Sequence, residues 1–172
     1  IVEACNTLNI KIIVVPLVDN GGLESQLQED KLVNILLQER QNLVALGVKI
    51  AFESDYTAAD LKRFIKRLPR DSFGINYDIG NSASLGYEAN QEFAHYGDRV
   101  INIHVKDRPL GGTTVPLGEG DADFETVFKN LSEYKYQGNY ILQTARDPGG
   151  RHGEVIGEYL KLINDWISIY ES

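Results

Sequence analysis

Residues 73–81, with the sequence FGINYDIGN, decide the fold. The part from Phe73 to Asp78 is an apolar, strand-like run that ends in a carboxylate, and a loop with Gly and Ser follows. Apolar runs that end in or just beside a residue able to bind a metal recur in IAFES at 50–54, INIHVK at 101–106 and YILQTA at 140–145. This repetition predicts parallel strands whose carboxyl ends carry functional side chains.

The regions between these runs have helical patterns, so the chain alternates strands and helices as parallel α/β folds do. Five βα units are predicted, in one domain over 1–172. The expected strands are 10–18, 48–53, 73–78, 100–105 and 140–144. The expected helices are about 24–46, one from residue 57, 87–96, about 124–134 and about 154–170.

Four strand ends carry a side chain that can bind a metal, namely Glu53, Asp78, His104 and Gln143. Their intervals are near the ~31 residues per βα unit of an eight-unit barrel of ~250 residues. An open doubly wound sheet would spread these side chains along its edge, whereas a barrel brings them to one axis. Convergence therefore favours the barrel, with a divalent ion, Mn²⁺, Mg²⁺, Zn²⁺ or Co²⁺, held by oxygen and imidazole ligands.

The composition is that of an ordinary globular protein, and the formal net charge of -8 opposes binding to nucleic acid. No apolar run approaches the ~20 residues of a membrane-spanning helix, so no membrane partner is expected. Cys5 is the single cysteine, which excludes an internal disulfide and fits a reducing cytoplasm. We expect Cys5 to be buried filler.

Five motifs in order resemble the xylose-isomerase-like TIM-barrel superfamily, in particular its sugar-phosphate isomerases and epimerases. They are FES at 52–54, YDIGNS at 77–82, IHVKDR at 103–108, PLGEGDADF at 116–124 and ILQTAR at 141–146. The resemblance implies that Glu53, Asp78, His104 and Gln143 bind one divalent metal, although the last position is usually Glu. It also implies an α/β (β/α)8 barrel of which this chain supplies strands four to eight.

On that resemblance, the N-terminal units of the barrel are expected to be absent from this chain. Five strands of a barrel leave sheet edges and apolar faces open. We therefore expect a longer natural protein, a partner chain such as a second copy in a homo-oligomer, or a rearranged open sheet. Of these we favour the longer protein.

Several polar side chains near the strand ends are candidates for contacts with substrate. Lys106, Arg108 and Arg146 could bind substrate hydroxyls or a phosphate, or form ion pairs with Asp107, Glu119 or Asp147 instead. By resemblance, Asn81 is expected to bind substrate and Glu119 to orient a metal ligand.

The expected function is that of a metal-dependent isomerase or epimerase of a small sugar or sugar phosphate. Glu53 would act as the base and remove a C–H proton next to a carbonyl, giving an enediolate. Because Gln143 cannot carry a proton, single-base isomerisation is favoured over epimerisation by two carboxylates. The alternatives are a non-catalytic sugar-binding or regulatory barrel and, less favoured, a phosphodiesterase like the abasic-site endonucleases.

Overall fold

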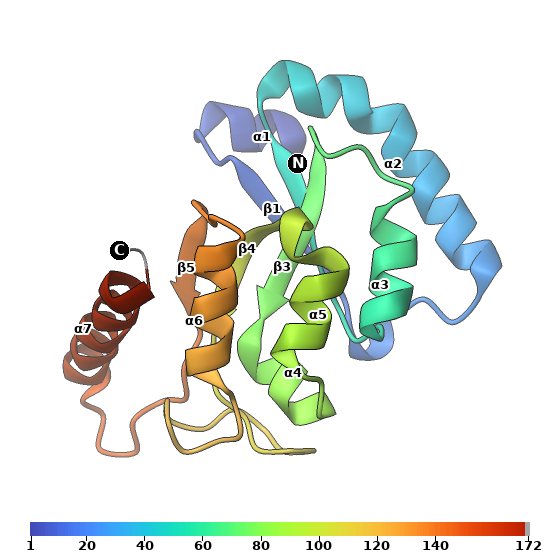
Figure 1. Ribbon diagram of the computed structural model, residues 1–172. Coiled ribbons are helices and arrows are strands. Elements are labelled where there is room, and N and C mark those ends of the chain that lie inside the picture. The colour runs from blue at the N-terminus through green and yellow to red at the C-terminus, as the bar shows by residue number, and fades with distance from the viewer. Residues whose placement is uncertain (171–172) are drawn as a thin grey trace. The chain divides into compact units, whose positions relative to one another are not determined.

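The computed structural model describes residues 1–170, in which five strands form one sheet in the order β1-β2-β3-β4-β5 (Figure 1). The strands are β1 (Ile12–Leu17), β2 (Lys49–Ser54), β3 (Phe73–Asp78), β4 (Val100–Val105) and β5 (Asn139–Leu142). β1 pairs with β2 and β2 with β3 in parallel, and Glu53 lies in register with Pro16. This strand order follows the chain, as in a barrel segment.

Helix α1 (Val2–Thr7) precedes β1 and α7 (His152–Tyr170) follows β5. The helices between strands are α2 (Gln26–Leu46), α3 (Ala58–Ile65), α4 (Ile79–Leu85), α5 (Ala89–Tyr96) and α6 (Phe124–Glu133). Two 3-10 turns, η1 (Asp19–Gly21) and η2 (Gly97–Arg99), complete the set. None of the helices in residues 1–170 has the length and apolar character needed to cross a membrane.

By its contacts the chain divides into two compact units, Ile1–Asn76 with Arg99–Asn102, and Tyr77–Asp98 with the chain from Ile103 onward. The first unit has an aromatic core, in which the Phe52 ring lies 5.2 Å from that of Phe64 and 6.4 Å from that of Phe73. Its helix α2 is capped by Ser25, whose side chain accepts a hydrogen bond from the Gln28 amide. Gly47, in the left-handed conformation, ends it.

The second unit has its own cluster of aromatic residues, and within this unit α5 contacts α6 and α6 contacts α7. Trp166 of α7 stacks on Phe124 at 4.8 Å, and Phe128 stacks on Tyr140 at 5.6 Å. Burial is uneven among the strands, because every residue of β3 is buried whereas most of β1 and β5 is half-buried or exposed. The central position of β3 makes it the best-fixed support for side chains at its end.

The five expected strands and their helices are confirmed, with boundaries shifted by a few residues. Cys5 is buried, as expected. Two helices were not expected. α4 occupies the predicted loop after residue 78, because Asp78 accepts a hydrogen bond from the Asn81 amide and Gly86 ends the helix with a φ of 71°. α1 precedes the first strand and buries Cys5.

Candidate metal centre

Glu53 lies near the end of β2, and its side chain is held by a buried chain of amides. The Asn76 amide nitrogen donates to Glu53 Oε2 at 2.9 Å, and the Asn102 amide nitrogen donates to Asn76 Oδ1 at 2.6 Å. All three residues are buried. Because Asn102 fixes the orientation of the Asn76 amide, Asn76 presents its N–H, not its oxygen, to the Glu53 carboxylate.

Asn76 and Asn102 were missed in the sequence, although a signal was present. Each lies two residues before a predicted metal-binding residue on the same strand, Asp78 or His104. Side chains two apart on a strand point to the same face of the sheet. A polar residue at that spacing inside an apolar strand is therefore a candidate for supporting the site.

Asp78 is the last residue of β3, and its two carboxylate oxygens have different surroundings. Oδ1 accepts the hydrogen bond that begins α4. Oδ2 lies 2.8 Å from Lys106 Nζ and 3.5 Å from His104 Nδ1. Within residues 1–170 this buried oxygen accepts no hydrogen bond of normal geometry. An oxygen in that state is suited to a cation.

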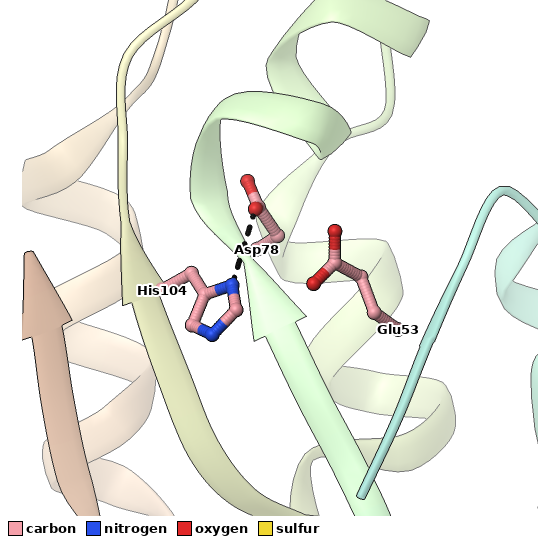
Figure 2. Close-up of side chains that lie close together, drawn as sticks. All are labelled: Glu53, Asp78 and His104. Atoms are coloured by element: carbon pink, nitrogen blue, oxygen red, sulfur yellow. Dashed lines mark ion pairs between the residues drawn. The ribbon is translucent and has the colours of Figure 1, made fainter. Parts of the chain in front are cut away.

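Glu53, Asp78 and His104 lie close together, and each offers a ligand atom within 4.8 Å of the others (Figure 2). Atoms that share one ion at ~2.0–2.2 Å are at most ~4.4 Å apart, so a small side-chain adjustment suffices. Two carboxylates and an imidazole are donors that Zn²⁺, Mn²⁺ and related ions accept. The donor set and the Asp78 oxygen therefore fit a divalent metal.

Gln143 follows β5 directly, and its backbone amide donates to the Val105 carbonyl at 3.0 Å. Its side-chain oxygen accepts a hydrogen bond from Lys106 Nζ at 3.0 Å. Gln143 is thus linked to Asp78 through the lysine ammonium, and its role as a metal ligand stays a prediction. The ion pair of Lys106 is with Asp78 and not with the acidic residues proposed as alternatives in the sequence.

Arg108 and Asn81 contact each other, since Arg108 Nη1 donates to Asn81 Oδ1 at 2.7 Å. The same guanidinium donates through Nε and Nη2 to the Gly112 carbonyl at 2.9 and 2.6 Å. These bonds hold Arg108 across the loop that follows β4. Binding of substrate by either side chain remains a prediction.

Asp107 organises the glycine-rich loop before α6, a role that sequence reasoning did not assign. Its carboxylate is buried and accepts hydrogen bonds from the amides of Gly118, Gly120 and Ala122 at 2.8, 3.0 and 3.2 Å. A Cβ on Gly120 would lie 2.2 Å from Asp107 Oδ1, so this position needs glycine. Glu119, expected to orient a metal ligand, is exposed.

Arg146 is exposed and lines a cavity of about 350 Å³ with residues at the start of α7, among them His152. The neighbouring Asp147 accepts a hydrogen bond from the Arg151 amide at 2.9 Å. That bond lowers the pKa of the Asp147 carboxyl. Asp147 thus serves the start of α7 and does not form the alternative ion pair with Arg146, whose contact with substrate remains a prediction.

The chain is similar to known proteins of one family. Residues 1–166 match the family model described as xylose isomerase-like TIM barrel. A curated relative, L-ribulose-5-phosphate 3-epimerase UlaE of Escherichia coli O1:K1, is 35% identical over 81 residues, which are 44% of this chain and 28% of that protein. The matched segment therefore spans less than a third of that relative.

Solved structures show the same fold. A xylose isomerase domain protein from Planctomyces limnophilus superposes with a TM-score of 0.81 and 21% identity, over 98% of this chain and 64% of that one. The IOLI protein, solved with a zinc atom, has a TM-score of 0.76 and 21% identity, over 98% of this chain and 67% of its own. Together with the family match and the sheet order, these likenesses show that the chain belongs to the xylose isomerase-like TIM-barrel family.

Proposed function

We propose that the protein is a divalent-metal-dependent isomerase or epimerase of a small sugar or sugar phosphate. The observation that carries the proposal is the meeting of Glu53, Asp78 and His104 within 4.8 Å of one another. The epimerase name of the E. coli relative and the zinc atom in the IOLI structure support it. Mn²⁺, Mg²⁺, Zn²⁺ and Co²⁺ all suit such ligands.

Glu53, Asp78, His104 and Gln143 would hold the ion. A bound divalent ion supplies Lewis acidity, which polarises a substrate carbonyl and acidifies the neighbouring C–H. Glu53 would then remove that proton, because its carboxylate is held at a strand end by the Asn76 amide. Return of the proton to the adjacent carbon gives an isomer, and return to the opposite face of the same carbon gives an epimer.

Gln143 favours chemistry with a single carboxylate base. An amide can coordinate an ion through its oxygen but cannot transfer a proton at neutral pH. Epimerisation would therefore require another proton donor on the opposite face of the substrate. Arg108 and Asn81, joined by a 2.7 Å hydrogen bond, would contact substrate hydroxyls beside this site.

The test combines metal analysis with hydrogen exchange. We expect the purified protein to contain or bind one divalent ion, and to exchange a substrate C–H with deuterated solvent for at least one ketose or ketose phosphate in a panel. Glu53→Gln should abolish the exchange with metal still bound. The control is Glu133→Gln, the same change at an exposed position of α6. Exchange that survives in Glu53→Gln would remove Glu53 from the role of base.

A non-catalytic sugar-binding barrel is the second candidate, and the ion pair between Lys106 and Asp78 favours it. In such a protein the ammonium would serve as the permanent partner of the carboxylate. This candidate would be supported if the protein binds a sugar but binds no ion at this site in an excess of Mn²⁺ or Zn²⁺.

A further inference from the structure

Lys106 has an unusual position for a lysine, because only 8% of it is exposed. Its ammonium lies 2.8 Å from Asp78 Oδ2 and donates to Gln143 Oε1 at 3.0 Å. Buried lysines are rare unless they are paired. Here the pairing groups are two of the four side chains that the proposed function assigns to a metal.

The path of the Lys106 side chain is built into the fold. A Cβ on Gly80, in α4, would lie 2.9 Å from Lys106 Cγ and 3.0 Å from the Lys106 carbonyl carbon. Any larger residue at position 80 would therefore collide with the lysine stem. Glycine in the first turn of α4 leaves the stem room to pass toward Asp78, so the contact is a packed feature and not a chance surface pairing.

The ammonium and a divalent ion compete for the same oxygens. An ion bound to Asp78 Oδ2 and Gln143 Oε1 would sit ~2.0–2.2 Å from each, within a few ångströms of the present ammonium. Two positive charges at that separation beside the buried Asp78 carboxylate repel each other. Lys106 is ion-paired with the first oxygen and hydrogen-bonded to the second, so its present position opposes binding of a metal there.

We propose that Lys106 is an internal cation that occupies part of the metal site and is displaced when the metal binds. In the position described above it neutralises Asp78 and holds Gln143. The inference rests on the proposed function for its metal site, and it adds a cost of displacement to metal binding. Loading would then need a higher concentration of metal than the ligands alone imply.

The first test measures the affinity for Zn²⁺ by competition with a chromogenic chelator. We expect Lys106→Met to bind Zn²⁺ at least about tenfold more tightly than the unaltered protein, which corresponds to about 1.4 kcal/mol. The control is Lys129→Met, which removes the same charge from an exposed position of α6 and should change affinity far less. A purely structural role predicts the opposite, since a disturbed site binds more weakly.

The second test needs no variant and therefore does not depend on folding of Lys106→Met. Lysines of the unaltered protein are acylated briefly with an amine-reactive reagent, with and without Zn²⁺, and quantified by mass spectrometry. We expect Zn²⁺ to increase modification of Lys106 several-fold and to leave Lys129 unchanged. Equal or lower modification of Lys106 with Zn²⁺ bound would overturn the inference.

The two tests also separate this inference from the proposed function. If the unaltered protein binds Zn²⁺ and exchanges substrate protons while Lys106→Met binds no more tightly, the inference alone fails. If Lys106→Met binds Zn²⁺ and the unaltered protein does not, the inference is supported and the proposal of a metal-dependent enzyme fails. If neither binds Zn²⁺, both proposals fail.

Discussion

The amide chain behind Glu53 gives a prediction that can be worked from the structure. Asn76 donates to Glu53 and accepts from Asn102, and both asparagines are buried. Asn76→Leu removes both bonds and leaves the Asn102 amide and a Glu53 oxygen without that partner. Each such loss costs ~1–3 kcal/mol, so we expect a fall of about 2–4 kcal/mol in the free energy of unfolding. Asn102→Leu removes one bond, and we expect about 1–2 kcal/mol.

The double variant tests whether the amides act as a chain. When both partners of a buried hydrogen bond are replaced by apolar groups, no amide between them is left unpaired. The loss in Asn76→Leu/Asn102→Leu should therefore be smaller than the sum of the two single losses, by about 1 kcal/mol.

Urea unfolding of the unaltered protein, the two single variants and the double variant measures this coupling. Asn34→Leu, the same substitution at an exposed position of α2, serves as control and should change stability by no more than ~0.5 kcal/mol. Additive losses, within ~0.3 kcal/mol, would refute the chain. A further readout is solvent exchange of substrate, which Asn102→Leu should slow less than Asn76→Leu because it reaches Glu53 through Asn76.

Three other substitutions follow from carboxylates in defined settings. Burial raises the pKa of Glu92 above its ordinary 4.5, so its stabilising contribution is full below that value and is lost as pH rises through the folded pKa. Stability measured from pH 4 to 8 should therefore shift in favour of Glu92→Gln as pH rises. Hydrogen bonds from arginines, chiefly the one from Arg63, lower the pKa of Glu29. The contribution of Glu29 to stability is therefore present above its ordinary 4.5 and is lost as pH falls through the folded pKa. Glu29→Gln should lower the free energy of unfolding by about 2 kcal/mol at pH 7, a modest amount because Arg63 is partly exposed. Near pH 2 the same substitution should lower it little. Gly120→Ala should lower the melting temperature, since the new Cβ meets Asp107 at 2.2 Å.

The sequence predicted the elements that have a strong periodic pattern. The apolar runs ending at Asp78 and Val105 are strands with the expected bounds, because they are short and bounded by polar residues. The helix after Asp78 was missed because GNSASL is rich in residues of low helix propensity. The capping bond that Asp78 accepts and the burial of Ile79 outweigh that propensity in the folded chain.

The site could be predicted in part for a similar reason. Glu53, Asp78 and His104 occupy equivalent strand ends, so their meeting follows from the register of a parallel sheet. Asn76 and Asn102 depend on amide orientations across three strands. A single sequence does not specify such orientations, because each amide can present either its oxygen or its nitrogen.

Lys106 shows where prediction from sequence stops, and why Asp78 is central to the site. Asp78 Oδ1 accepts a hydrogen bond from the Asn81 amide at the start of α4. This local bond, which a capping pattern in the sequence can indicate, fixes the plane of the carboxylate. The other oxygen then faces the end of β4, where a lysine with four flexible carbons could reach substrate, solvent or the carboxylate itself. What selects the carboxylate is the space at Gly80, a contact between segments far apart in sequence. The Asp78 carboxylate, a proposed metal ligand, is thus oriented by local structure, whereas the position of Lys106 beside it is set by tertiary packing.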